Sequence, residues 1–242
     1  MNDAGGVAVG KRAATEALRA GRATEVLIAR DSRETEGMRE VLAAAETSGI
    51  KVRRVERHEL DQLADDNRGV VAILRPTKQF SERDISSFDF EEDALVVVLD
   101  GVTDPQNLGA AARVADAAGA AMLVTRIKRA APVTDAAVKA SAGALLALPH
   151  AKVANIPRAL ERLKDSGFTV AGLDAAAPRS VYSEPRPDGR IAVVVGSEGT
   201  GMSRLVTEAC DVLVSIPMKG NVASLNAASG LAAALFSWVV RE

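Results

Sequence analysis

The residues from about 94 onward alternate short apolar runs with segments of helical pattern. The apolar runs have the length and composition of buried strands; they are Leu95–Leu99, Ala121–Val124, Thr169–Gly172, Ile191–Val195 and Val212–Ile216. Helices are predicted between most of them and after the last; they are Leu108–Ala118, Thr134–Leu146, Ile156–Asp165, Ser203–Ala209 and Leu225–Val240. Such alternation favours parallel pairing, with helices on both faces of the sheet. We therefore predict an α/β fold with a mainly parallel sheet for residues 94–242.

A smaller α/β unit is predicted ahead of this sheet, within residues 1–75. Its expected elements are the helices Ala13–Leu18, Met38–Thr47 and Leu60–Ala64 and the strands Glu25–Ala29, Val52–Val55 and Val70–Leu74. Apolar residues at spacings of three and four support the second helix, and Gly49 follows its end, as is common at helix C-termini. Residues 76–93 contain a serine pair and a short acidic run, which are typical of a linker.

Length and composition narrow the class of protein. A chain of 242 residues can bury a large core without a disulfide or a structural metal. Cys210 is the only cysteine, which excludes an intrachain disulfide and fits a reducing cytoplasm. The N-terminus lacks the features of a signal peptide, and the most apolar stretch, Ala227–Val240, is too short and interrupted for a membrane helix. These features together predict a cytoplasmic protein. His58 and His150 have no partners at the spacing of metal ligands, so no metal site is expected.

The balance of charge does not by itself indicate a nucleic-acid partner. The chain has 30 basic and 32 acidic residues, which give a net charge of −2, so an RNA-binding surface requires basic residues to gather in space. Two short segments are candidates for such a surface. The first holds Lys51, Arg53, Arg54 and Arg57, and the second holds Arg126, Lys128 and Arg129. The alternative for both segments is an ordinary solvated surface.

Three polar or glycine-rich segments each follow a predicted strand. They are Asn107–Arg113, Gly196–Met202 and Ile216–Asn226. In open α/β sheets, ligands bind outside the carboxyl ends of the strands. The three segments can therefore converge on one ligand, and their polar residues stand where the packing of a core gives no reason for them.

The first segment holds an asparagine and an arginine six residues apart. Asn107 stands just before an alanine-rich helix, where it is either the N-cap or a functional group. Arg113 lies among alanines, which leave room for a phosphate or a ribose to approach its paired donors. Binding of an anionic oxygen is therefore the expected role of Arg113.

The other two segments combine glycines with isolated polar side chains. The glycines of the second segment do not have the spacing of the dinucleotide-binding fingerprint. Glu198 among them is either a charge partner for a helix N-terminus or a functional group. Ser224 or Asn226 is a candidate N-cap for the last helix. However, the polar residues between positions 219 and 226 exceed what one cap requires, which favours a binding loop.

The three segments together resemble the signature motifs of the SpoU (TrmH) family of RNA ribose 2′-O-methyltransferases, within the SPOUT class. The motif N-x-G-x-x-x-R is matched by Asn107, Gly109 and Arg113. The motif G-x-E-G-x-G is matched by Gly196, Glu198, Gly199 and Gly201. The motif I-P-M-x-G-x-x-x-S-L-N is matched by Ile216, Pro217, Met218, Gly220, Ser224, Leu225 and Asn226. The order and spacing agree, and the resemblance covers nearly the whole chain.

The resemblance implies a fold, a cofactor and partners. The C-terminal domain would be a SPOUT-type parallel sheet with a trefoil knot, and the N-terminal unit a ribosomal-protein-like domain that binds the RNA substrate. The cofactor would be S-adenosylmethionine, and the favoured substrate a guanosine of 23S rRNA or of its assembly precursor, with no DNA or membrane partner. A homodimer is also implied. The apolar last helix, with Phe236 and Trp238, is a suitable dimer surface or, alternatively, part of the core.

The resemblance also implies roles for individual residues. The expected cofactor-binding residues are Gly196, Gly201, Ile216, Met218 and Leu225. The expected catalytic residues are Asn107, Arg113, Glu198, Ser224 and Asn226. Arg113 would hold the 2′-oxygen and the adjacent phosphate, and Glu198 would hold its loop or pair with Arg113. Because a guanidinium does not readily lose a proton, a phosphate relay or stabilisation of the developing alkoxide is the expected route.

Other functions remain open beside this one. A tRNA 2′-O-methyltransferase or an antibiotic-resistance rRNA methyltransferase of the same family would keep the chemistry and change the substrate. A non-catalytic RNA-binding ribosome-assembly factor would keep the fold, although the presence of Asn107 and Arg113 disfavours it. A nucleotide-dependent oxidoreductase is disfavoured by the missing dinucleotide fingerprint.

Overall fold

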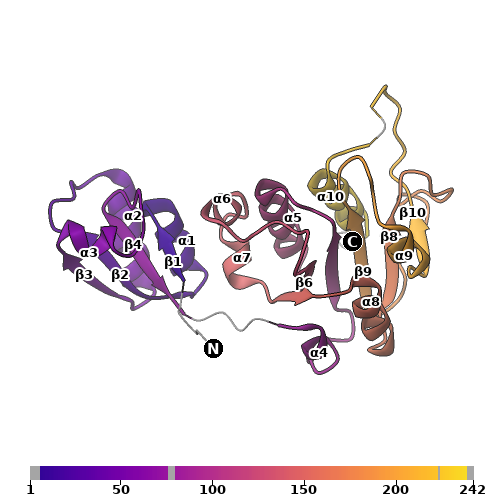
Figure 1. The fold of residues 1–242 in the computed structure, drawn as a ribbon, viewed down its shortest axis with the longest axis horizontal. Helices are drawn as coiled ribbons and strands as arrows, with labels where there is room; N and C mark the ends of the chain where they lie inside the picture. The colour runs from indigo at the N-terminus through magenta and orange to yellow at the C-terminus, as the bar shows by residue number, and fades with distance from the viewer. Residues whose placement is uncertain (1–5, 76–79, 223, 239–242) are drawn as a thin grey trace.

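The N-terminal unit is a mixed four-stranded sheet with helices on it. The computed structural model describes residues 6–75, 80–222 and 224–238 (Figure 1). The elements of the unit are β1 (Val7–Val9), α1 (Lys11–Arg19), β2 (Ala23–Ala29), α2 (Glu36–Thr47), β3 (Lys51–Val55), α3 (Arg57–Asp61) and β4 (Val70–Leu74). The strand order is β1-β4-β2-β3, in which only β2 and β3 pair in parallel. The α/β character predicted for this unit is confirmed.

Two local elements of this unit differ from the prediction. The sequence does not predict the strand β1, because its three residues are too few to show an alternation of apolar and polar positions. The helix α3 begins before the predicted Leu60–Ala64 and ends at Asp61. Its start is set by a capping box, in which the side chains of Glu56 and Glu59 each accept a hydrogen bond from the backbone N–H of the other residue.

The segment predicted as a linker is folded against the C-terminal unit from Phe80 onward. It contains the short helix α4 (Glu82–Ile85). A row of ring contacts anchors it; the phenylalanines are Phe80, Phe88, Phe90 and Phe168. Glu82 is buried and forms an ion pair with Arg158 of the C-terminal unit. The polar composition of the segment concealed these apolar anchors in the sequence. Residues 76–79 of the predicted linker lie outside the described residues.

The C-terminal unit is built on a sheet of six parallel strands. They are β5 (Leu95–Asp100), β6 (Ala120–Arg126), β7 (His150–Val153), β8 (Thr169–Leu173), β9 (Ile191–Gly196) and β10 (Val212–Val214). Their order is β10-β8-β9-β5-β6-β7, and every pair is parallel. The predicted parallel sheet is confirmed, although β7 is too short and polar to be found from the sequence. Because the strands are parallel, all their carboxyl ends lie at one edge.

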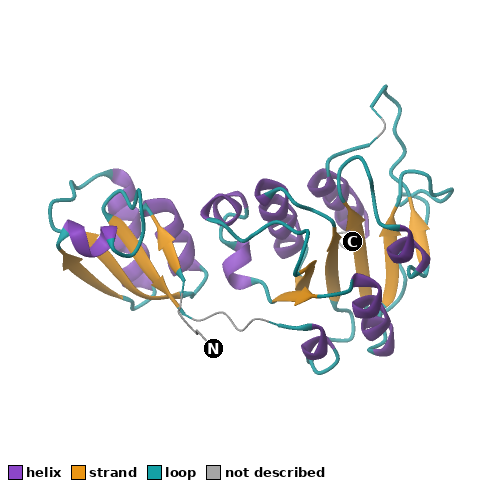
Figure 2. Ribbon diagram, in the orientation of Figure 1, coloured by secondary structure: helices purple, strands orange, loops and turns teal. Residues whose placement is uncertain are grey.

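Helices cover both faces of this sheet (Figure 2). They are α5 (Pro105–Ala117), α6 (Asp135–Ala140), α7 (Ala144–Ala147), α8 (Ile156–Asp165), α9 (Arg204–Glu208) and α10 (Ala227–Trp238). One core cluster joins the sheet to α5, α6, α7 and α10, and a second joins it to α4, α8 and α9. In the described ranges, no helix is long and apolar enough to cross a membrane.

The helix predicted over Thr134–Leu146 is two helices, α6 and α7. Between them, Ala142 and Gly143 have φ values of 49° and 89°, which end the right-handed helix. A Cβ at Gly143 would lie 3.2 Å from the Cβ of Glu16 in α1. Glycine therefore provides both the turn and a close approach between the two units.

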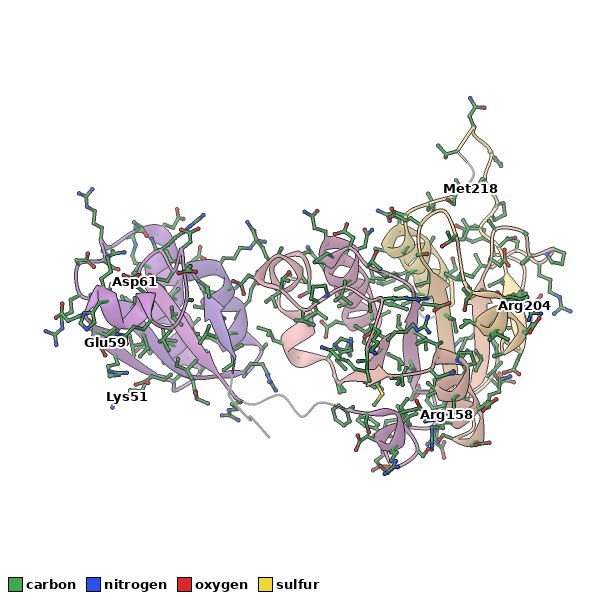
Figure 3. All side chains as sticks on the ribbon, in the orientation of Figure 1. Lys51, Glu59, Asp61, Arg158, Arg204 and Met218 are labelled. Carbon is green, nitrogen blue, oxygen red and sulfur yellow. The ribbon has the colours of Figure 1, made fainter. Side chains whose placement is uncertain are left out.

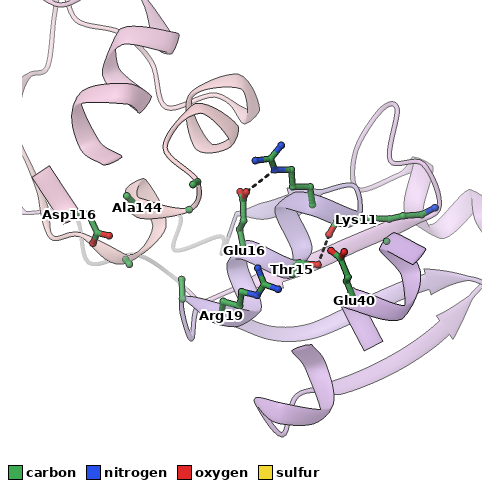
Figure 4. A pocket seen from close by; sticks show the side chains of 13 residues that line it. Lys11, Thr15, Glu16, Arg19, Glu40, Asp116 and Ala144 are labelled. Carbon is green, nitrogen blue, oxygen red and sulfur yellow. Dashed lines mark hydrogen bonds and ion pairs between the residues drawn. The ribbon is translucent and has the colours of Figure 1, made fainter. Parts of the chain in front are cut away.

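The two units contact each other through α1 on one side and α6 and α7 on the other. Val138 and Leu146 are buried in the same cluster as Ala14, Ala17 and Leu18. Beside this contact lies an open cavity of about 610 Å³ (Figure 4). Its charged lining balances in sign; the residues are Lys11, Arg12 and Arg19 against Glu16, Glu40 and Asp116. This cavity therefore has no evident preference for an ion of either sign.

Candidate active site

A pocket of about 370 Å³ opens at the carboxyl ends of β8, β9 and β10, beside the start of α10. This is the edge at which parallel sheets bind ligands, and the volume falls in the range of small-molecule sites. All the predicted site residues except Asn107 and Arg113 line it; they are Gly196, Glu198, Gly201, Ile216, Met218, Ser224, Leu225 and Asn226. The second and third motifs therefore converge on one cavity.

The loop Gly196–Met202 folds back on the end of β9. The backbone groups of Ser197 and Gly201 exchange two hydrogen bonds, of 2.9 and 3.2 Å. A Cβ on Gly196 would overlap the backbone of Gly201 and Met202, so only glycine permits this closure. The wall of the pocket on this side is therefore largely backbone, which a ligand can approach closely.

A buried carboxylate fixes the exit of this loop. Asp100, the last residue of β5, is only 3% exposed and stands opposite Gly196 in the β5–β9 pairing. Its Oδ2 accepts a hydrogen bond from the backbone N–H of Ser203 at 2.8 Å. Ser203 directly precedes α9, so the loop is tied to the neighbouring strand. The sequence signal for Asp100 was an acidic residue at the end of a wholly apolar run.

Asn107 and Glu198 meet across the edge of the sheet. The Nδ2 of Asn107 donates a hydrogen bond to Oε1 of Glu198 at 3.1 Å. The N-cap of α5 is Asp104, whose carboxylate accepts from the backbone N–H of Gln106, so the capping interpretation of Asn107 is wrong. Glu198 also lies at the first turn of α5, where the helix dipole favours negative charge. This contact agrees with the interpretation of Glu198 as a charge partner for a helix N-terminus, and its functional role stays a prediction.

The third segment runs from the end of β10 to the start of α10. Ile216 and Met218 are half-buried in the pocket wall, and Leu225, which also lines it, is 40% exposed. Figure 3 labels Met218 on the connection that projects beyond the sheet. The Oδ1 of Asn226 accepts from the backbone N–H of Ser229 at 2.7 Å. Asn226 thus caps α10, as one of the two interpretations predicts, and lines the pocket as well.

Arg113 is exposed on α5 and does not line the pocket. Six helical residues separate it from Asn107, which corresponds to about 9 Å along the axis and about 120° around it. Within the described part of the chain, its side chain makes no hydrogen bond or ion pair. The side chain of Glu198 contacts Asn107 instead. A single chain therefore does not form the pairing of Arg113 with Glu198 that was one alternative.

The residues after β8 belong to the pocket but were missed in the sequence. They are Asp174, Ala175 and Ala176, and Leu173 at the end of β8 lines the pocket as well. The Oδ1 of Asp174 accepts from the backbone N–H of Ala176 at 2.8 Å, which turns the chain at the strand end. The rule that ligands bind at the carboxyl ends of strands, applied to β8 as well, would have found them.

The lining indicates the chemistry of the ligand. Among the described residues that form it, Asp174 and Glu198 carry negative charge and no lysine or arginine is present. A phosphate group would meet two carboxylates and no cation, which is unfavourable. A flat, weakly polar group fits the apolar side chains of Ile216 and Leu225 and the backbone opposite, and a positive charge fits the carboxylates.

The histidine and the cysteine singled out in the sequence lie outside this pocket. The Nε2 of His150 is 2.8 Å from Oγ1 of Thr125, and burial lowers the pKa of His150 to about 4. Burial raises the pKa of the half-buried Cys210 thiol to about 12. In the part of the chain that the structure covers, no group of three histidine, cysteine or acidic residues is placed to hold a metal ion.

Family models match both units of the chain. Residues 94–236 match the SpoU rRNA methylase family, and residues 7–80 match the model described as RNA 2′-O ribose methyltransferase substrate binding.

Similar proteins cover nearly the full length. The 23S rRNA (guanosine-2′-O-)-methyltransferase RlmB of Photobacterium profundum is 37% identical over 221 residues, which are 90% of this chain and 89% of the relative. RlmB of Salmonella typhi is 36% identical over 210 residues, 86% of each chain. The crystal structure of the SpoU methyltransferase AviRb from Streptomyces viridochromogenes, in complex with AdoMet, has a TM-score of 0.76 and 27% identity, covering 97% of this chain and 89% of that one. This chain therefore belongs to the SpoU rRNA methylase family, the RNA 2′-O-methyltransferases that its three motifs predict.

Proposed function

We propose that this chain transfers the methyl group of S-adenosylmethionine to the ribose 2′-oxygen of a guanosine in 23S rRNA. The choice of substrate is supported by the name that the RlmB relatives share, at 36–37% identity over most of the chain. One observation carries the assignment of the site. Segments 196–202, 216–218 and 224–226 line one pocket, and Asn107 of the first motif is hydrogen-bonded to Glu198 there.

The pocket suits S-adenosylmethionine in shape and charge. This cofactor supplies an electrophilic methyl group on a positively charged sulfur. The backbone of the loop Gly196–Met202 and the side chains of Ile216 and Leu225 would contact the adenine. The carboxylates of Asp174 and Glu198 would favour the positive charge, and the described lining holds no basic residue to oppose it.

Polar residues at the pocket would hold the acceptor ribose in line with the methyl group. The hydroxyl of Ser224, which lines the pocket, is suited to hydrogen-bond the RNA. Asn107 orients Glu198. Arg113 would bind the phosphate beside the target ribose and stabilise negative charge on the 2′-oxygen as its proton passes through that phosphate to water. Because a guanidinium does not accept that proton, positioning and electrostatic stabilisation supply the rate.

A homodimer would bring Arg113 to the chemistry. Within one chain, Arg113 is exposed and does not line the pocket that holds Ser224. The helices α5 and α10 pack against each other, and α10 carries Phe236, which is 42% exposed. We propose that this surface forms the dimer interface and that Arg113 of one subunit completes the pocket of its partner. Mixing inactive Arg113→Ala and Ser224→Ala subunits should then restore part of the activity, and a mixture without activity would contradict the arrangement.

The remaining implications of the resemblance stay predictions. They are RNA binding by residues 1–75, methyl transfer by residues 94–242, a trefoil knot in the latter and a cytoplasmic location. The match of residues 7–80 to a substrate-binding model supports the first of them.

The proposed reaction is tested by transfer of tritiated methyl groups from S-adenosylmethionine to 23S rRNA transcribed in vitro, with tRNA in parallel and nuclease mapping of the product. Label in 23S rRNA as one 2′-O-methylguanosine is the expected result. Label only in tRNA would keep the chemistry and refute the substrate. Absence of label from both, in a protein that still binds the cofactor, would refute methylation of free RNA.

A further inference from the structure

The two basic segments of the sequence have different surroundings in the structure. In the first, Arg53 and Arg57 pair with acidic neighbours, while Lys51 and Arg54 are exposed and make no ion pair among the described residues; the ion pairs are Arg53–Glu25, Arg53–Glu59 and Arg57–Asp31. Figure 3 shows Lys51 and Glu59 at the end of the N-terminal unit that is remote from the catalytic unit. Half of the positive charge of this segment is therefore paired, and the segment lies far from the pocket.

The second segment, Arg126–Arg129, keeps its positive charge free. It forms the end of β6 and the start of the connection to α6, and Lys128 and Arg129 are exposed. Over the described ranges, no side chain of these three basic residues makes an ion pair or hydrogen bond. Ile127 between them is 60% exposed. Arg129 has a φ of 58°, a conformation that suits glycine or asparagine better than arginine. Neither packing nor backbone conformation therefore accounts for this concentration of charge.

The connection that carries this segment is fixed beside the active site. The backbone N–H of Ala131 donates to the carbonyl oxygen of Val102 at 2.9 Å. Val102 lies in the connection from β5 to α5, just before the Asp104 cap and the first turn that holds Asn107. Strands β5 and β6 are direct neighbours, so their carboxyl ends are about 5 Å apart.

The order of the sheet places the segment between two RNA-related parts. Along the carboxyl edge, the pocket occupies the ends of β10, β8 and β9, Asn107 follows β5, and Arg126–Arg129 follows β6. The next elements along the chain, α6 and α7, contact α1 of the N-terminal unit (Figure 1). Along the carboxyl edge of the sheet, this segment therefore lies between the pocket and the elements that contact the N-terminal unit.

We propose that Arg126, Lys128 and Arg129 bind the phosphate backbone of the RNA substrate between the N-terminal unit and the methyl-transfer pocket. The inference rests on the proposed function, because it takes RNA as the substrate. Contacts to phosphates position a nucleic acid without reading its sequence. The segment therefore contributes affinity and orientation for the RNA and has no part in choosing the nucleotide or in binding the cofactor.

The salt dependence of RNA binding tests this proposal. The double variant Arg126→Gln/Lys128→Gln is compared with Arg53→Gln/Arg57→Gln, which removes the same charge from the paired segment. The dissociation constant for 23S rRNA transcribed in vitro is measured over a range of roughly 50 to 200 mM KCl. The logarithm of the association constant falls linearly with the logarithm of the salt concentration, and the loss of two phosphate contacts should make this slope less steep by about 1.5. We expect roughly tenfold weaker binding at the middle of this range, and the Arg53/Arg57 variant should change the slope by less than half as much.

Further variants separate charge from structure. Arg126→Lys/Lys128→Arg keeps the charge and should keep the slope, while Arg129→Asn, which tolerates the left-handed backbone, should lower it by about 0.8. Binding of S-adenosylmethionine should be unchanged in all of them, which shows that they are folded. The inference is overturned if the Arg126/Lys128 variant keeps the wild-type salt slope, or if the Arg53/Arg57 variant loses as much of that slope. In either case, methylation of 23S rRNA by the wild type still upholds the proposed function. A wild-type protein that neither binds nor methylates 23S rRNA overturns both.

Discussion

The hydrogen bond between Asp100 and Ser203 gives a direct test of how the loop Gly196–Met202 is held. Ser203→Pro removes the backbone N–H that donates to Oδ2 of Asp100. The φ of Ser203 is −65°, the value at which a proline ring is fixed. The change therefore leaves φ unstrained, but it deletes the donor and places the ring carbon Cδ where the carboxylate of Asp100 now lies. Ser203→Ala is the matched control, because the Ser203 hydroxyl makes no capping hydrogen bond.

The size of the effect follows from the burial of Asp100. A hydrogen bond to a charged group contributes about 1.5–3 kcal/mol, and a carboxylate that is 3% exposed cannot regain full hydration when its donor is lost. We expect Ser203→Pro to lower the free energy of unfolding by at least about 2 kcal/mol, because the displaced carboxylate adds to the lost hydrogen bond, and Ser203→Ala by less than about 0.5 kcal/mol. Because the loop Gly196–Met202 lines the pocket, we also expect S-adenosylmethionine to bind about tenfold more weakly to Ser203→Pro.

Urea unfolding and calorimetric titration with S-adenosylmethionine measure the two effects. Asp100→Asn keeps an oxygen acceptor and should be milder than Asp100→Ala in both. Ser203→Pro and Asp100→Ala should be non-additive when combined, since each removes the same hydrogen bond. If Ser203→Pro equals the wild type in stability and in cofactor affinity, or if Ser203→Ala is as damaging, then the loop is not held in this way.

Three further changes test the catalytic, capping and titrating residues. Arg113→Ala should lower kcat by at least about 100-fold while calorimetry shows an unchanged cofactor affinity; an active variant would contradict its role. Asn226→Ala should lower the free energy of unfolding by about 1 kcal/mol, because the N–H of Ser229 loses its acceptor, and Asn226→Ser should recover most of it. His150 has a folded pKa of about 4 against an ordinary 6.5, so the unfolded chain binds the proton first. The contribution of neutral His150 to the free energy of unfolding is complete above pH 6.5. As the pH falls toward 4, this contribution of up to about 3 kcal/mol is lost. Urea titrations of His150→Gln should show a flatter dependence over this window, and an equal dependence would mean that another group is responsible.

The sequence predicts those parts of the molecule whose signal is local. The strands β5 and β9 are continuous apolar runs, and the motif residues at their carboxyl ends converge because parallel strands end at one edge. What the sequence does not predict depends on contacts between distant residues. Asp104 rather than Asn107 caps α5, which leaves Asn107 free for a partner 91 positions away.

The errors in the fold have the same origin. The break between α6 and α7 lies where Gly143 approaches α1 of the other unit, and no pattern of apolar spacing reports that approach. The anchoring of Phe90 becomes visible only when Phe168, distant in sequence, is placed beside it. Arg113 matches a motif, yet the single chain leaves it exposed and outside the pocket, and the sequence motif does not report this position.

The late position of the pocket residues in the sequence has a consequence for synthesis of the protein. The side chains of the pocket come from residues after position 172, so they are the last to leave the ribosome. At about 5–20 residues per second, roughly 10–30 s separate the emergence of β4 from that of Asn226. During this interval the nascent protein has the unit that matches a substrate-binding model but lacks the last walls of the pocket. With the roles proposed for the two parts, a newly made molecule meets RNA before it is able to bind a methyl donor.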